Sequence, residues 1–123
     1  MERHYGVLPT DCDQIRDLIS GSSLESIWIC NGGEQRSRDG ASLLNIYGYM
    51  SIHISGGFED IRELSEEQRE FFFNSLVGVR NIFIILDREE RAKYGSEIEN
   101  IKSRNKNVLV CELKETILMS YAY

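Results

Sequence analysis

The chain has 123 residues and a formal net charge of −6, and 41% of its residues are hydrophobic. This length suits one domain over residues 1–123 that can bury a core without metal or disulfide support. The acidic balance argues against nucleic acid or an anionic membrane as partner, because both need clustered lysine and arginine.

The three cysteines, Cys12, Cys30 and Cys111, are odd in number and match no zinc spacing. Free thiols in a reducing compartment are the simplest interpretation. Neither a signal-like segment nor a membrane-length apolar run is visible. We therefore expect a cytoplasmic protein with no metal and no cofactor.

The first half of the chain predicts an irregular start over residues 1–9, then a helix over 10–20 capped by Thr10. Residues 26–30 read as a strand that stops at a glycine turn. Residues 36–46 favour a short helix. The alternative is one strand over 44–54, whose apolar residues alternate, although Gly48 weakens it.

Further along, residues 49–55 alternate as a strand, with His53 on the polar face and expected at the surface. A capping box at Ser65 to Gln68 opens a helix that ends near residue 77. Residues 81–86 and 108–113 read as buried strands. Between them, residues 87–102 favour a charged helix capped by Asp87 and interrupted at Gly95.

Strands that alternate with helices imply right-handed crossovers and a doubly wound sheet. The predicted fold is α/β, with a mainly parallel four-stranded sheet flanked by helices and an extra N-terminal helix. Ligands bind such sheets at the carboxyl ends of the strands. Cys30 lies at the carboxyl end of the first predicted strand.

The segment from Cys30 to Ser37 has the composition of an anion-binding loop. Its glycines allow successive amides to point inward, and a helix begins behind it. The expected phosphate-binding residues are Asn31, Gly32, Gly33, Glu34, Gln35 and Arg36. The Arg36 guanidinium matches two phosphate oxygens, and Ser37 can donate to the Cys30 sulfur.

This arrangement predicts phosphoryl transfer with Cys30 as the nucleophile. The thiolate attacks phosphorus, an alcohol leaves, and water hydrolyses the phosphocysteine. Amides and Arg36 stabilise the equatorial oxygens. The alternatives to a catalytic loop are a buried Cys30 with a purely structural role, an Arg36 exposed to solvent and an ordinary glycine turn.

The strand-Cys-x5-Arg-Ser-helix order of Cys30, Gly32, Arg36 and Ser37 resembles the low-molecular-weight protein tyrosine phosphatases. Residues 48–57 resemble the family's second strand, which places Ser55 beside the loop as a supporting residue. The resemblance implies that the chain has the fold of this family and hydrolyses phosphotyrosine or small aryl phosphomonoesters. Trp28, Tyr47 and Tyr49 could rim the pocket, or simply pack.

Two departures from the family pattern stand out. Gly33 replaces an asparagine that holds a left-handed turn and bonds the serine at Ser55; glycine adopts the turn without that bond. No aspartate follows residue 108, so Glu115 is the candidate general acid. The alternatives to a phosphatase are an inactive phosphate- or phosphoprotein-binding module and a small acidic inhibitor, of the immunity type, of a basic partner.

Overall fold

The computed structural model describes residues 6–21 and 23–113, which form a parallel sheet flanked by helices. The strand order is β1-β3-β2-β4-β5, and every neighbouring pair is parallel. The strands are β1 (Gly6–Val7), β2 (Ser26–Ile29), β3 (Ser51–Ile54), β4 (Asn81–Asp87) and β5 (Val108–Leu113). The helices are α1 (Cys12–Ser20), α2 (Gln35–Ile46), α3 (Gly57–Glu63), α4 (Glu66–Ser75), α5 (Arg88–Lys93) and α6 (Gly95–Arg104).

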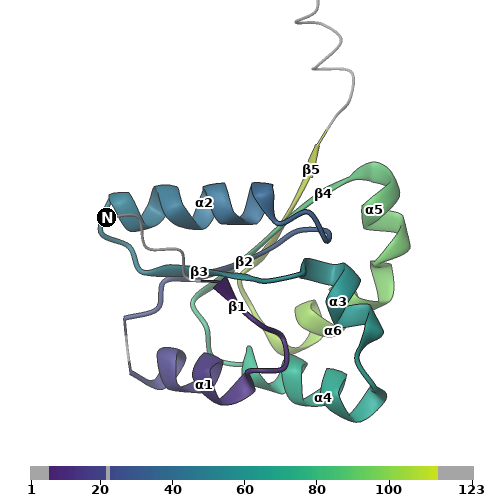
Figure 1. The fold of residues 1–123 in the computed structure, drawn as a ribbon, viewed down its shortest axis with the longest axis horizontal. Coiled ribbons are helices and arrows are strands. Elements are labelled where there is room, and N and C mark those ends of the chain that lie inside the picture. The colour runs from purple at the N-terminus through teal and green to yellow at the C-terminus, as the bar shows by residue number, and fades with distance from the viewer. Residues whose placement is uncertain (1–5, 22, 114–123) are drawn as a thin grey trace, which may run out of the picture.

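The helices lie on both faces of the sheet. Helix α2 covers one face, while α1, α3, α4 and α6 lie on the other, and α5 stands at one end (Figure 1). This is the layer arrangement that alternating strands and helices favour, because each crossover returns over one face of the sheet. The doubly wound α/β class predicted from the sequence is confirmed.

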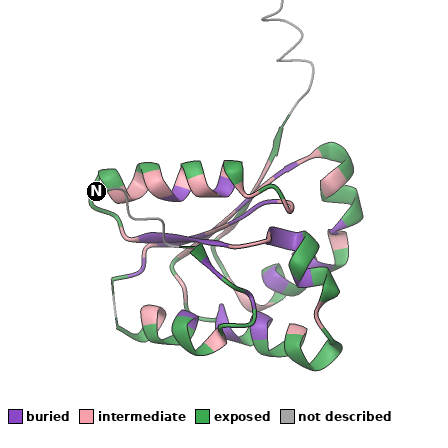
Figure 2. Cartoon of the chain, viewed as in Figure 1, coloured by how far each residue is buried: buried purple, intermediate pink, exposed green. Residues whose placement is uncertain are grey.

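The apolar core lies between the sheet and the helix layer of α1, α3, α4 and α6. Alternate residues of the central strands are fully buried there: Ile27, Ile29, Ile52, Ile54, Ile82, Ile84 and Leu86. The helices contribute Ile15, Phe58, Ile61, Phe72 and Ile98 to the same cluster. Figure 2 shows the buried residues concentrated on the sheet and on the inward sides of the helices.

The opposite face of the sheet is more polar. Ser26 Oγ and Ser51 Oγ lie 2.7 Å apart, and Trp28 Nε1 donates to Ser26 Oγ at 2.9 Å. Gly40 lets α2 approach the Trp28 ring, because a Cβ at Gly40 would lie 2.3 Å from Cζ3 of the ring. This close approach positions α2 on the sheet. The helix follows the segment over residues 30–34, which we call the Cys30 loop.

The order of the strands reverses at the carboxyl ends of β2 and β4, the place that doubly wound sheets use as their ligand-binding crevice. From β2 the chain crosses to β3 on one side, and from β3 it returns past β2 to β4 on the other. Such a reversal is where open α/β sheets bind ligands. The Cys30 loop follows β2 and helix α5 follows β4, so both flank this crevice.

Two elements were missed, and the predicted four-stranded sheet is wrong by one strand. Strand β1 pairs with β3 at the edge, in a segment that the sequence suggested was irregular. Helix α3 begins directly after Gly56, between the predicted strand over 49–55 and the predicted helix that starts at Ser65, where no helix was expected. Both elements are shorter than the windows over which apolar periodicity is counted, since β1 has two residues and α3 has seven.

Most of the other boundaries are confirmed. Helix α2 exists, and the alternative strand over 44–54 is wrong. The capping box of α4 is present with both reciprocal bonds, and Asp87 caps α5. Thr10 does not cap α1: the N-cap is Asp11, without a side-chain hydrogen bond.

Burial corrects two expectations. His53 is 4% exposed rather than on the surface, because the β3 face that carries it lies under α2. Strand β5 is an edge strand, so Leu109 is 54% exposed and the prediction of a buried strand is wrong. Within the described residues, no helix is long and apolar enough to cross a membrane.

Candidate functional site

The loop between β2 and α2 makes a tight turn that its own side chains stabilise. Asn31 Oδ1 accepts from the Gly33 amide at 3.1 Å, and the Gln35 amide donates to the Gly33 carbonyl oxygen at 2.7 Å. Glu34, the residue before α2, is left-handed with φ 63°. The expected left-handed residue, Gly33, has no positive φ, so the strained position lies one residue later than predicted.

A chain of hydrogen bonds links the sulfur to this turn. Cys30 Sγ donates to Ser37 Oγ at 3.1 Å, and Ser37 Oγ donates to the Glu34 carbonyl oxygen at 3.0 Å. Cys30 and Ser37 are both fully buried. The serine therefore joins the predicted nucleophile to the first turn of α2.

The Arg36 guanidinium is held by a carboxylate from the other side of the crevice. Its Nη1 donates to Glu90 Oε1 at 2.8 Å, and Glu90 Oε2 accepts from Asn31 Nδ2. The Arg36 side chain is 35% exposed and that of Glu90 is 16% exposed. One carboxylate thus contacts two residues of the predicted phosphate loop.

Glu90 is itself fixed by the capping box of α5. Its Oε1 accepts from the Asp87 amide at 2.8 Å, and its own amide donates to Asp87 Oδ1 at 2.8 Å. A reciprocal cap of this kind restricts the rotamers of both side chains. The carboxylate is therefore positioned before any ligand arrives.

Helix α3 supports the loop from its other side. The Phe58 amide donates to the Cys30 carbonyl oxygen at 2.9 Å. Gly57 has φ +54°, and a Cβ there would lie 2.2 Å from the Cys30 carbonyl oxygen. The Glu59 side chain lies against Gly32, where a Cβ would meet its Oε2 at 2.2 Å.

A second contact between side chains holds Glu34. Its Oε1 lies 3.5 Å from His53 Nε2, and the two side chains are 26% and 5% exposed. The partner of Glu34 comes from the β3 face under α2. Glu34, the left-handed residue, therefore contacts the sheet through its side chain and Ser37 through its carbonyl oxygen.

The structure brings most of the predicted site residues together. Residues 30–37 form one strand-loop-helix unit, although the Gly33 and Gln35 amides are bonded inside the loop rather than free for an anion. Ser55 lies near by at the end of β3, where its amide donates to the Val7 carbonyl oxygen at 2.9 Å. Glu115 lies outside the described residues.

The three aromatic candidates lie elsewhere. Trp28 packs on Phe83, with the ring centroids 4.5 Å apart. Tyr47 and Tyr49 are 71% and 53% exposed, but they flank the amino end of β3, at the opposite edge of the sheet from the loop. These three residues pack or face solvent rather than rim the crevice.

The other two cysteines are separate from the loop. Cys12 is partly buried at the start of α1, and burial raises the pKa of its thiol above the ordinary value. Cys111 is partly buried on the edge strand β5.

Glu90 and Gly57 are the site residues that sequence reasoning missed. Glu90 had a visible signal, since Asp87-x-x-Glu90 follows a buried strand and matches a capping box at the carboxyl edge of the sheet. Gly57 had none beyond its place in a glycine pair. Because Gly57 has no Cβ, the start of α3 can contact the Cys30 loop, which is distant from it in the sequence.

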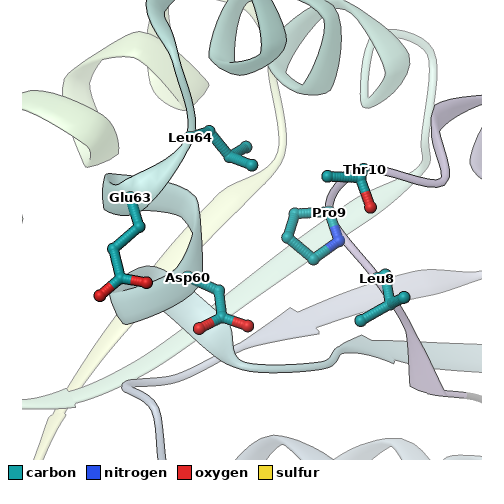
Figure 3. A pocket seen from close by; sticks show the side chains of 6 residues that line it. All are labelled: Leu8, Pro9, Thr10, Asp60, Glu63 and Leu64. Atoms are coloured by element: carbon teal, nitrogen blue, oxygen red, sulfur yellow. The ribbon is translucent and has the colours of Figure 1, made fainter.

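A shallow depression lies beside this region, between the segment after β1 and helix α3. It is lined by Leu8, Pro9, Thr10, Asp60, Glu63 and Leu64, and no loop residue contributes to it (Figure 3). Among residues 6–21 and 23–113, no three His, Cys, Asp or Glu side chains are grouped to hold a metal ion.

Comparison with known proteins yields no relative. No protein-family model, no curated protein and no solved structure matches the chain. The geometry of the crevice is therefore the basis for assigning a function.

Proposed function

We propose that the chain is a cysteine-dependent phosphatase that hydrolyses phosphotyrosine or small aryl phosphomonoesters. One observation carries the proposal: Cys30 Sγ lies 3.1 Å from Ser37 Oγ in a loop that also presents Arg36 at the strand-order reversal. A nucleophile, its hydrogen-bond partner and a bidentate cation share one crevice. Resemblance to the low-molecular-weight tyrosine phosphatases supports the same chemistry.

The reaction proceeds in two displacements. Cys30 loses its thiol proton to solvent, the thiolate attacks phosphorus, an S–P bond forms, and the ester P–O bond breaks to release the phenolate, which is protonated. A second water then attacks the phosphocysteine, and the S–P bond breaks to give phosphate and the thiolate. Arg36 stabilises the equatorial oxygens in both steps.

The described conformation is a resting state of this site. Cys30 is fully buried and Arg36 is paired with Glu90, so a substrate reaches the sulfur only after the loop side chains rearrange. Arg36 is part-exposed, so its guanidinium can be reached by a phosphate from solvent. Exchange of its carboxylate partner for phosphate oxygens opens the site.

The test is turnover of p-nitrophenyl phosphate. Replacement Cys30→Ser should lower the rate on the order of 10³-fold, because the hydroxyl is a much weaker nucleophile. Cys111→Ser is the matched control and should leave the rate unchanged, since Cys111 lies on β5. If Cys30→Ser keeps the wild-type rate, the enzyme hypothesis is wrong.

A second candidate is a phosphate-binding module without turnover. The complete burial of Cys30 favours it, because a nucleophile must reach its substrate. This candidate predicts saturable binding of phosphate or phosphoprotein that Arg36→Ala abolishes, with no release of p-nitrophenol. The pair of measurements therefore separates the two functions.

A further inference from the structure

The chemistry proposed above needs a proton donor if the leaving oxygen is a poor leaving group. Several carboxylates lie near the loop in the described part of the chain, among them Glu34, Glu59 and Glu90. Glu34 is paired with His53, and Glu59 lies against the backbone at Gly32. Glu90 contacts the side chains of the predicted phosphate-binding residues Asn31 and Arg36.

We propose that Glu90 is the general acid of this site, activated when the phosphate dianion takes its partners. This inference rests on the proposed phosphatase function. It assigns the proton donor to a residue after β4 rather than to Glu115.

The first step of the argument is an exchange of partners. In the described conformation Arg36 Nη1 donates to Glu90 Oε1 at 2.8 Å. A dianion carries twice its charge and offers the planar guanidinium two oxygens, so it competes well for Arg36. Once Arg36 has turned to the ligand, the Glu90 carboxylate loses the cation that stabilised its charge.

The second step is proton uptake. The freed carboxylate is 16% exposed and faces a dianion held by the same loop. Like charge and partial burial both favour the neutral carboxyl form. Two further carboxylates, Asp87 in the same cap and Glu59 against Gly32 of the loop, add negative charge in the same direction.

The third step concerns the position of the Glu90 carboxyl relative to the bound phosphate ester. Both partners that release Glu90 belong to the loop that would cradle the phosphate, so the protonated carboxyl lies beside the ester oxygens. The cap at Asp87 holds it there, with its Oε1 2.8 Å from the Asp87 amide. Release of Asn31 also frees the side chain that occupies the Gly33 amide at 3.1 Å.

The proton balance closes over one cycle. The Glu90 carboxyl donates its proton to the leaving oxygen as the P–O bond breaks and the S–P bond forms. The resulting carboxylate takes a proton from the water that attacks the phosphocysteine. Phosphate departs, and Glu90 returns its proton to solvent as Arg36 pairs with it again.

The experiment compares two substrates and one inert dianion. Rates are measured with p-nitrophenyl phosphate, whose leaving group departs without protonation, and with phenyl phosphate, whose leaving group needs a proton. Calorimetric titration of tungstate in buffers of different ionisation enthalpy counts the protons taken up on binding. The variants are Glu90→Gln, Glu115→Gln and, as matched control, Glu89→Gln, which removes an exposed charge one residue earlier.

The expected result is selective. Glu90→Gln should slow phenyl phosphate about 10²-fold or more, while p-nitrophenyl phosphate should change less than about threefold. Tungstate should bring about one proton into the wild type and into Glu89→Gln, and none into Glu90→Gln. Glutamine can still accept the capping bond, so the fold of α5 is kept.

Three outcomes would overturn the assignment. Equal slowing of both substrates by Glu90→Gln would indicate a structural role, and unchanged proton uptake would place the proton elsewhere. The selective loss in Glu115→Gln instead would return the role to that residue. Absence of any wild-type turnover would refute the phosphatase itself, which separates that failure from this one.

A second variant guards against misfolding of Glu90→Gln. Glu90→Asp keeps the charge and draws the carboxyl back by one methylene, away from the ester oxygen. It should show the same selective loss on phenyl phosphate. Wild-type rates on both substrates in Glu90→Asp would contradict the proposal.

Discussion

Glu34 has φ 63°, a conformation that in the described part of the chain is otherwise confined to glycines. A left-handed residue with a Cβ costs about 1–2 kcal/mol relative to a right-handed one. Its carbonyl oxygen accepts from Ser37, and its carboxylate lies 3.5 Å from His53. The strain is therefore held by contacts made in the folded state, at the loop that also contains Arg36.

The sequence could predict which residues form the site better than how they are arranged. Cys30, Arg36 and Ser37 are close in the chain, so the strand-loop-helix pattern brings them together. The glycines pointed to Gly33 as the left-handed residue, and the structure assigns that role to Glu34. The pairing of Arg36 with Glu90 could not be predicted, because it depends on which strand lies beside β2.

Replacement of the single residue Gly57 should destabilise the fold. A Cβ there would lie 2.0 and 2.2 Å from the carbonyl oxygens of Asn31 and Cys30, in a backbone conformation that disfavours side chains. Gly57→Ala should therefore lower the free energy of unfolding by about 2 kcal/mol or more and displace the loop. Urea denaturation measures the first effect, and p-nitrophenyl phosphate turnover measures the second.

Gly95→Ala is the matched control for that variant. Gly95 has open space around its Cβ position and begins α6 without a positive φ. Alanine there should be neutral or stabilise the fold by up to about 1 kcal/mol. Equal stability of the two variants would show that Gly57 does not limit the approach of α3 to the loop.

At the scale of elements, capping boxes and apolar alternation were sufficient to predict helices and strands wherever the sequence contains them. The capping boxes at Ser65 and Asp87 mark the starts of α4 and α5, and the alternation over 49–55 marks β3. Burial was harder to predict. His53 occupies a polar-looking face that α2 covers, whereas β5 reads as apolar yet lies at the edge.

Contacts between helices give a pH-dependent prediction. Arg104 of α6 donates to Glu70 of α4 at 2.9 Å, and this hydrogen bond lowers the pKa of the Glu70 carboxyl below its ordinary value. A carboxyl with a lower pKa in the fold stabilises the protein above its unfolded pKa, and this stabilisation is lost as the pH falls through the folded pKa. Wild type should thus exceed Glu70→Gln in stability at neutral pH, and by a smaller margin near pH 3.

Urea denaturation of both proteins at about pH 7 and about pH 3 checks this. Glu66→Gln serves as control, since Glu66 is an exposed acidic residue in the first turn of the same helix. A constant difference between wild type and Glu70→Gln at the two pH values would exclude the Arg104 contact as its cause. High salt should shrink the difference, because the Glu70 side chain is 59% exposed.

At the scale of the whole molecule, the strand order reverses between β2 and β4, and the Cys30 loop and α5 follow these two strands. The class of fold followed from the alternation of strands and helices. The strand order did not, because alternation alone leaves open which strands are neighbours. The order β3-β2-β4-β5 has the same sequence of neighbours as flavodoxin-like sheets, counted from β2.

Anion binding at the crevice should stabilise the whole fold. A ligand that binds only the native state contributes about 2.7 kcal/mol at a concentration 100 times its Kd, or roughly 10 °C in Tm for a domain of this size. Tungstate should therefore raise the Tm of the wild type by this amount, as measured by differential scanning calorimetry. Arg36→Ala should remove the shift, and the same shift in that variant would mean that tungstate binds elsewhere.

The pairing of Arg36 with Glu90 joins residues 54 positions apart, and it forms across strands β2 and β4. A nascent chain that has left the ribosome only as far as β3 would carry the sulfur, the guanidinium and the serine, but not the carboxylate that restrains them. The loop would then be exposed to solvent with its arginine unpaired. Formation of α5 after β4 is the event that pairs Arg36 and brings the proposed acid, Glu90, to the Cys30 loop.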